Sequence, residues 1–190
     1  MIFLALLVAL ALTLPMEARA EPPRVDTNTE RVVALAADDV SLWVATEGGL
    51  ERYDRASGAR LRLYTPLDGL SESSTLGVRI RAGEVEVRNR RARCRLDQRR
   101  DAFVCEEAPE LAPAEPRILG TLEGHRVSAR LAVGDERYVG TAGGGVFRDG
   151  SPPRRLTPEG QLCANHVVDI VAHEGSVYLG TFDDGLCVLE

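Results

Sequence analysis

Three stretches of the chain repeat one pattern: LWVATEGGL at residues 42–50, RYVGTAGGGV at residues 137–146 and VYLGTFDDGL at residues 177–186. Each has an aromatic residue in second position, then an aliphatic residue, a small residue and a Thr, and a Gly-containing turn follows. A fourth, degenerate copy has Glu86 at the aromatic position. The four aromatic-equivalent positions are Trp43, Glu86, Tyr138 and Tyr178. Because self-similarity at a roughly fixed period is the signature of repeat architectures, we let this repeat decide the fold.

One period of the repeat reads as four short β-strands. In the first copy, alternation and turn signals place them at about residues 31–36, 41–45, 50–53 and 61–64. Four-stranded units that recur every 40 to 45 residues are β-propeller blades. A Pro-rich insert at residues 109–116 lengthens the step from the second copy to the third. Its prolines have no N–H to donate to a sheet, so it is not expected to form a strand. We therefore expect an all-β propeller of four-stranded antiparallel blades, at residues 31–70, 71–108, 117–160 and 161–190.

Residues 43–71 resemble the two-component regulator propeller repeat of bacteria, and residues 156–167 repeat the end of that motif. The resemblance covers most of residues 31–190 and is weakest in the second copy. It implies a periplasmic sensor propeller that recognises an extracellular ligand, such as a glycan fragment. Propellers of this family are usually larger than four blades, and the fourth copy lacks its outer strand. We therefore expect an incomplete or open propeller, either as a fragment of a larger gene or with copies that associate; a small four-bladed ring closed by residues 21–31 is the alternative.

The first 20 residues have the features of a secretory signal peptide. An apolar run over residues 2–14 ends at Pro15, and Ala18 and Ala20 supply the small residues that a signal peptidase requires. The run is shorter than the roughly 20 residues that span a bilayer. We expect a signal peptide at residues 1–20, a linker at residues 21–30, and a periplasmic or secreted mature chain without a membrane span. Retention of the apolar run as an anchor is the alternative.

The even number of cysteines in an exported chain predicts disulfides. Cys94 and Cys105 flank a hairpin turn, so they would face each other on adjacent strands. Cys163 precedes the first strand of the fourth blade and Cys187 begins its third strand, and these positions lie at the same end of the blade. The expected pairs are Cys94–Cys105 and Cys163–Cys187, with Cα atoms closer than about 7 Å.

Composition and motifs argue against several classes of function. The net charge is −6, which disfavours a nucleic-acid binder carried by overall charge. All 23 basic residues are Arg, so Schiff-base, Walker and kinase lysines are excluded. No Gly-x-Ser-x-Gly elbow is present. We expect no cofactor and no metal, since the one zinc alternative lacks closely spaced ligand pairs. That alternative would use Cys163, His166, His173 and Cys187.

Residues 79–100 form the most basic segment of the chain. They contain nine Arg and three acidic residues, a local charge of +6 that leaves −12 for the rest. Arg side chains bind carboxylates bidentately, so this segment is a candidate site for an acidic polysaccharide. The alternative is that the Arg stems cover the faces of a degenerate blade while their charged ends reach water.

Candidate ligand-binding residues gather at one end of the blades. Loops that precede the first strand and turns between the second and third strands converge there on the mouth of the central channel. The candidates are Glu47, Glu72, His125, His166, Asp183 and Asp184. Packing is the alternative role for the histidines, and solvated turns for the two aspartates. We predict non-catalytic recognition of an extracellular ligand or partner; a scaffold whose blade edges pair with other chains and a propeller lyase or lactonase are the alternatives.

Overall fold

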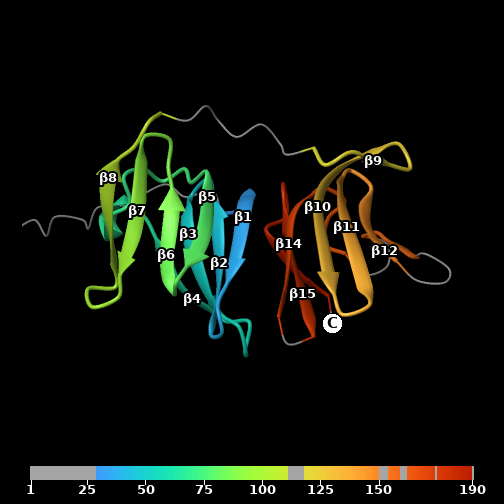
Figure 1. The fold of residues 1–190 in the computed structure, drawn as a ribbon, viewed down its shortest axis with the longest axis horizontal. Coiled ribbons are helices and arrows are strands. Elements are labelled where there is room, and N and C mark those ends of the chain that lie inside the picture. Colours follow the sequence, from blue (N-terminus) through green and yellow to red (C-terminus); the bar gives the residue numbers. More distant parts are fainter. Residues whose placement is uncertain (1–28, 111–117, 150–153, 159–161, 174, 190) are drawn as a thin grey trace, which may run out of the picture.

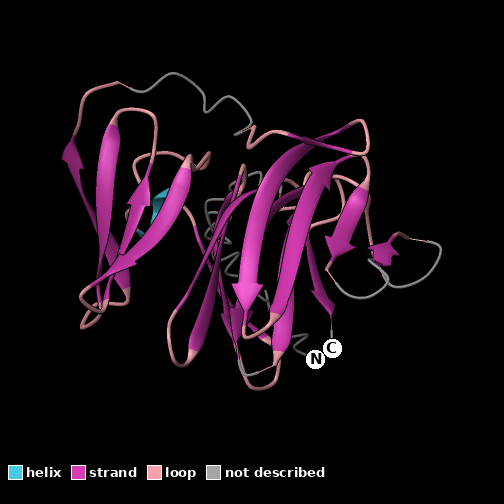
Figure 2. Ribbon diagram, turned by 45° about the vertical axis from the view of Figure 1, so that its right-hand side comes forward, coloured by secondary structure: helices cyan, strands magenta, loops and turns pink. Residues whose placement is uncertain are grey.

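The computed structural model describes residues 29–110, 118–149, 154–158, 162–173 and 175–189. They form four antiparallel sheets, here called blades 1 to 4 in chain order, and one short 3-10 helix, η1 (Pro66–Asp68) (Figures 1 and 2). Blade 1 consists of β1 (Val32–Ala37), β2 (Ser41–Thr46), β3 (Gly49–Asp54) and β4 (Arg60–Tyr64). Blade 2 consists of β5 (Gly77–Arg81), β6 (Glu84–Arg88), β7 (Ala92–Asp97) and β8 (Ala102–Glu107).

Blades 3 and 4 depart from the four-stranded pattern. Blade 3 consists of β9 (Thr121–Leu122), β10 (His125–Val133), β11 (Glu136–Ala142), β12 (Gly145–Arg148) and β13 (Arg154–Leu156). Its extra strand arises because Glu123 and Gly124 both have positive φ and fold β9 back onto β10. Blade 4 consists of β14 (Val167–His173), β15 (Ser176–Thr181) and β16 (Leu186–Leu189). The all-β propeller fold expected from the repeat is confirmed, and blade 4 has only three strands among the described residues.

The register of the repeat is confirmed, because all four aromatic-equivalent positions lie on the second strand of their blade. Trp43 is 2% exposed, and the two tyrosines are also buried. Glu86 is buried at the same position and forms ion pairs with Arg79 and with Arg93, the latter at 3.1 Å. The carboxylate that replaces an aromatic ring at this position is therefore compensated by charge. Burial is tolerated because guanidinium groups from the neighbouring strands neutralise it.

Neighbouring blades pack through one recurring contact. A Cβ added to Gly140 of blade 3 would lie 2.7 Å from Val167 of blade 4, and a Cβ added to Gly180 of blade 4 would lie 2.6 Å from Val32 of blade 1. Only glycine allows so close an approach. Backbone hydrogen bonds repeat as well: Gly145 donates to Asn165 O at 2.9 Å, and Gly185 donates to Glu30 O at 2.8 Å. Blade 4 therefore packs on blade 1 as blade 3 packs on blade 4.

The blades consequently stand in the order 3, 4, 1, 2. Figure 1 shows this order, with red β14 between orange β10 and blue β1, and with green β5 beyond β1. The propeller is open, as expected, but its opening lies between blades 2 and 3, which are consecutive in sequence. The Pro-rich insert connects these two ends of the arc. Closure by residues 21–31 falls almost entirely outside the described residues.

Both expected disulfides are confirmed. The Cα atoms are 4.0 Å apart in Cys94–Cys105 and 6.0 Å apart in Cys163–Cys187. Both thiolates that the zinc alternative requires are therefore used in a disulfide. Among the described residues, no helix is long and apolar enough to cross a membrane. The expected signal peptide lies outside the described residues.

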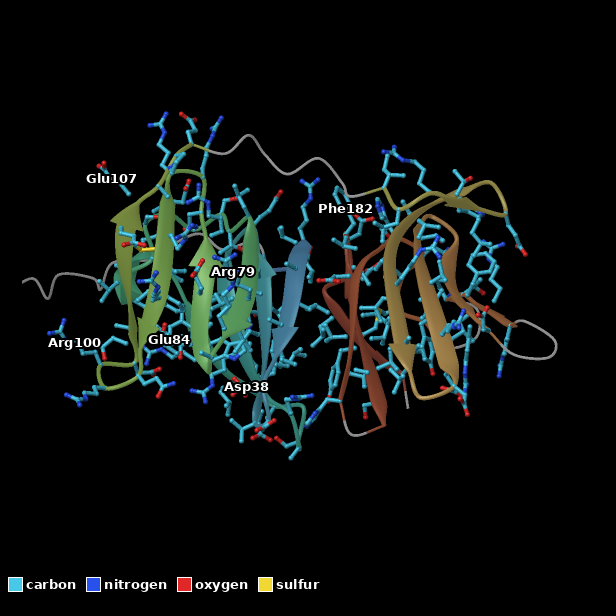
Figure 3. The ribbon with its side chains drawn as sticks, in the orientation of Figure 1. Asp38, Arg79, Glu84, Arg100, Glu107 and Phe182 are labelled. Carbon is cyan, nitrogen blue, oxygen red and sulfur yellow. A yellow bond between two sulfur atoms is a disulfide. The ribbon has the colours of Figure 1, made fainter. Side chains whose placement is uncertain are left out.

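One carboxylate fixes the turn that precedes Trp43. Asp38, labelled at the lower end in Figure 3, accepts hydrogen bonds from the backbone N–H groups of Val40 (3.0 Å) and Ser41 (2.7 Å). It also accepts one from the Trp43 indole N–H at 3.0 Å. Burial acts to raise the pKa of Asp38, but these hydrogen bonds outweigh it and hold the pKa below its usual value.

We predict that Gly180→Ala destabilises the protein, because the new methyl group would overlap Val32 in the seam between blades 4 and 1. The expected loss is about 1–3 kcal/mol in the free energy of unfolding, measured by urea denaturation. Gly77→Ala is the matched control, since nothing lies within 4 Å of its added Cβ. A Gly180→Ala protein as stable as the Gly77→Ala protein would contradict the placement of blade 4 on blade 1.

We also predict that Asp38 contributes to loss of stability in acid. Its pKa is lower in the folded than in the unfolded chain, so its contribution is present above about pH 4 and disappears as pH falls through the folded pKa. Asp38→Asn should therefore lower the melting temperature at pH 7 and flatten its decline between pH 5 and pH 2. Asp39→Asn, on the exposed neighbour, is the control and should decline as the unmodified protein does.

Candidate functional site

The six candidate ligand residues lie at the starts of innermost strands, in the segments that precede them, or in turns between second and third strands. Figure 1 shows β1, β10 and β14 beginning at the upper end of the blades. The structure brings four of the six residues together at the seam between blades 4 and 1: Glu47, His166, Asp183 and Asp184. Glu72 belongs to blade 2, where its carboxylate accepts the backbone N–H of Arg90 at 2.7 Å. His125 begins β10 of blade 3 and contacts Arg155 at 3.4 Å.

A stack of four side chains crosses the seam. The ring of His166 lies against Phe182 with centroids 4.8 Å apart and planes at 15°. On Phe182, the Arg31 guanidinium carbon lies 3.8 Å from the ring centroid, and Arg31 forms an ion pair with Glu47 at 2.9 Å. Figure 3 shows Phe182 at the upper end between β1 and β14. Phe182 contacts His166 of blade 4 and Arg31, which precedes β1 of blade 1, so it links the two blades. Because these two contacts cover its ring, it does not serve as a surface on which a sugar stacks.

A hollow of about 400 Å³ adjoins this stack. The β15–β16 turn and the start of β16 form one wall, and β3 and β4 of blade 1 form the other. Thr29 and Glu30, just before β1, complete it. Four of its nine lining residues are acidic and one is basic, so the hollow carries a net negative charge. Its lining residues are Thr29, Glu30, Glu51, Tyr53, Arg60, Asp183, Asp184, Gly185 and Leu186.

The inner carboxylate of the hollow is neutralised. Glu51 is 3% exposed; its Oε2 accepts the Tyr53 hydroxyl at 3.0 Å and its Oε1 pairs with Arg60 at 2.8 Å. Burial raises the pKa of Tyr53 to about 12, and the nearby Glu51 charge and hydrogen bond add to the rise. The hydrogen bond to Glu51 also raises the pKa of Arg60. Tyr53 therefore keeps its proton at neutral pH, and its hydroxyl and the Arg60 guanidinium hold Glu51 in a fixed position.

The mouth of the hollow offers hydrogen-bond acceptors. Asp183 and Asp184 are exposed in their turn, and the backbone N–H of Asp184 donates to the Thr181 hydroxyl at 3.1 Å, which fixes the turn. Glu30, which lies just before β1 of blade 1, lines the same hollow. Within the described ranges, no group of three or more metal-ligating side chains is found. Carboxylates in this arrangement can bind hydroxyl groups or cationic groups.

Arginines of the basic segment at residues 79–100 pair with nearby carboxylates, as the alternative to a polysaccharide site expects. Besides the pairs of Glu86, Arg95 approaches Glu106 at 3.6 Å and Arg90 pairs with Glu110 at 3.1 Å. Arg100, labelled on the β7–β8 turn in Figure 3, pairs with Asp97 at 3.5 Å. Two carboxylates from outside the segment, Glu106 and Glu110, therefore offset part of its charge of +6.

Sequence reasoning missed five residues of the seam: Arg31, Glu51, Tyr53, Arg60 and Phe182. Two of them have repeat equivalents among the candidates. Arg31 precedes the first buried Val of blade 1 as His166 does in blade 4, and Phe182 follows Thr181 as Glu47 follows Thr46. The equivalence was visible in the sequence, but the contact between blades 4 and 1 was not.

Comparisons with known proteins give only distant likenesses. No protein-family model matches the sequence, and no curated protein matches it. The extracellular domain of a hybrid two-component system from B. thetaiotaomicron is 18% identical with a TM-score of 0.40, over 88% of this chain and 28% of that one. A second such domain from that organism is 18% identical with a TM-score of 0.33, over 84% of this chain and 21% of that one.

Virginiamycin B lyase from Staphylococcus aureus is 8% identical with a TM-score of 0.36, over 86% of this chain and 56% of that one. Of the two extracellular domains of two-component systems, this chain spans about a quarter of the length. Likenesses of this degree carry no argument about function, which has to come from the site.

We predict that Arg60→Gln destabilises the protein, because Glu51 would keep a buried charge with only the Tyr53 hydroxyl as partner. The expected loss is about 1 kcal/mol, at the low end because the Arg60 side chain is 54% exposed. The double variant Glu51→Gln/Arg60→Gln should recover part of the loss in urea denaturation. If it recovers none, Arg60 does not act by neutralising Glu51.

Proposed function

We propose that this protein is a non-catalytic recognition module that works outside the cytoplasm and binds a hydroxyl-rich or cationic ligand, such as a short neutral glycan, in the acidic hollow. One observation carries the proposal: carboxylates from two blades converge on a hollow of about 400 Å³. This volume lies in the range of small-molecule sites. Hydroxyl and ammonium groups are the donors that such carboxylates accept.

The chemistry of the hollow favours binding over catalysis. General acid–base catalysis works best with a pKa near the operating pH. Tyr53, with a pKa of about 12, keeps its proton at neutral pH, and both Glu51 oxygens already hold partners. These three groups therefore orient a ligand and exchange no proton with it.

The two disulfides support a location outside the cytoplasm, because disulfides persist in oxidising compartments. Cys163–Cys187 also serves the hollow directly. It ties β16, whose Leu186 lines the hollow, to the loop that leads into β14. The acidic turn is thus held in position before a ligand arrives, which lowers the ordering cost of binding.

A second candidate function is a scaffold that pairs with other chains at a blade edge. Among the described residues, β16 is hydrogen-bonded to β15 alone, and Val188 on it is 47% exposed. Unpaired strand edges are templates for strand addition from a partner. This alternative requires no ligand in the hollow, so ligand binding distinguishes the two.

We predict that neutral or basic oligosaccharides raise the melting temperature of the protein and that oligogalacturonate does not, because the hollow is acidic. The panel would comprise hexamers of cellulose, xylan, arabinan and chitosan, screened by thermal shift, and a ligand that binds only the folded state must stabilise it. Asp183→Asn/Asp184→Asn should weaken binding about tenfold or more. Asp135→Asn/Asp149→Asn, on blade 3, removes the same charge away from the hollow and should bind normally.

Two results would contradict this proposal. The first is a shift of equal size with oligogalacturonate, which would place binding on basic residues. The second is unchanged binding in Asp183→Asn/Asp184→Asn. Absence of any shift across the panel would favour the scaffold function.

A further inference from the structure

Each seam joins two kinds of blade face. The forward face of a blade carries its aromatic-equivalent residue and a small residue two positions later, Trp43 and Ala45 in blade 1. The rear face carries the apolar residues that meet the preceding blade, Leu35 and Val44 in blade 1. Because the blades stand in the order 3, 4, 1, 2, two faces have no blade against them among the residues that the structure describes: the rear face of blade 3 and the forward face of blade 2.

The rear face of blade 3 carries arginines where other blades carry apolar residues. Arg130 pairs with Val139 in the register in which Leu35 pairs with Val44 and Ile170 with Leu179. Arg137 holds the register position of Leu42 and Val177, which are both buried, and Arg155 that of Leu63. All three arginines are exposed. We define this arginine face by Arg130, Arg137 and Arg155.

The forward face of blade 2 is charged as well, so the arc ends in polar faces on both sides. Arg88 stands where blades 1, 3 and 4 have Ala45, Gly140 and Gly180, and it donates to the carbonyl of Pro109. A side chain of this size would block the close approach that Gly140 and Gly180 allow in the seams of blade 3 with blade 4 and of blade 4 with blade 1. Terminal repeats of repeat proteins require such polar outer faces.

The two end faces differ in how their charge is balanced. On blade 2, Glu86 and Glu106 pair with arginines. On the arginine face, none of the three guanidinium groups forms an ion pair with any residue that the structure describes. Arg130 contacts the carbonyl of Leu119 at 3.5 Å, and Arg155 Nε donates to Gly144 O at 2.8 Å. Their positive charge is thus available to a partner.

We propose that the arginine face is a docking surface for an acidic surface of another protein. Its centre is apolar: Val139 is half-buried, and Phe147 is 8% exposed with the Arg155 guanidinium carbon 5.5 Å from its ring centroid. Arginine and aromatic residues around an apolar centre are the composition of protein interfaces. Phe147 lies beneath Arg155 and offers no open ring on which a sugar could stack. A partner with carboxylates at its rim fits this surface.

The spacing of the charges requires an extended partner. Arg130 and Arg155 lie in one row across the sheet, three strand spacings or about 14 Å apart, so one small anion cannot bridge them. A second copy does not fit through its own free end face, because Arg88 would oppose Arg130. The proposal is independent of the acidic hollow, which lies at the seam of blades 4 and 1.

The test measures binding of the full chain to fluorescently labelled poly-L-glutamate by anisotropy at low and at physiological salt. Arg130→Gln/Arg137→Gln/Arg155→Gln should weaken binding about tenfold or more. Arg81→Gln/Arg90→Gln/Arg99→Gln is the matched control: it removes the same charge from exposed arginines of blade 2. We expect it to change the affinity less than twofold. Melting temperatures of both triple variants report whether they are folded.

Three outcomes would overturn the proposal. Equal loss of affinity in both triple variants would show that the attraction follows net charge. Tighter binding of polygalacturonate than of poly-L-glutamate, lost in the arginine-face variant, would assign the face to an acidic polysaccharide. No binding of poly-L-glutamate at either salt concentration would exclude the acidic protein partner. Binding of the hollow's ligand is measured on the arginine-face variant as well. If that binding is unchanged, none of the three outcomes bears on the function proposed for the acidic hollow.

Discussion

The packing of blade 4 on blade 1 depends on the missing side chain of Gly180. A Cβ there would lie 2.6 Å from Val32, so any other residue would force the innermost strand of blade 1 outward. Glycine lets Val32 and Leu35 approach the backbone of β15 directly, and the Gly185–Glu30 backbone hydrogen bond becomes possible beside them. This contact joins the first and last blades. It therefore determines which faces of the molecule are buried and where the arc ends.

The candidate site exists only because of that contact. The acidic turn of blade 4 and the Glu51 trio of blade 1 belong to segments more than a hundred residues apart in sequence, and neither encloses a hollow alone. The Phe182 stack lies at the upper rim of the same seam and ties Arg31 to His166 across it. A ligand that touches both walls would therefore stabilise the seam, which gives the module a route from binding to a change in the stability of its architecture.

Sequence patterns predicted what local geometry controls. Alternation and turns placed the strands, the repeat placed Trp43 and Glu86 on second strands, and a hairpin register placed Cys94 opposite Cys105. They could not predict the order of the blades, because no local pattern tells which valine Gly180 meets. They also missed Tyr53 as a partner of Glu51, since the pair lines a hollow only where blade 4 packs beside it.

The arginines show why charge counted along a sequence differs from charge on a surface. Residues 79–100 hold nine Arg and three acidic residues, yet strand pairing sets Glu86 among these arginines and pairs it with Arg79 and Arg93 of the same blade. Arg130, Arg137 and Arg155 are scattered over 26 positions and form no run, but antiparallel register gathers them on one face, where none of them forms an ion pair with a described residue. The strand register of blade 3, which can be compared with that of blades 1 and 4, places these dispersed residues on one surface. The arginine face of blade 3 is therefore a product of strand register and is not visible as a run of charge in the sequence.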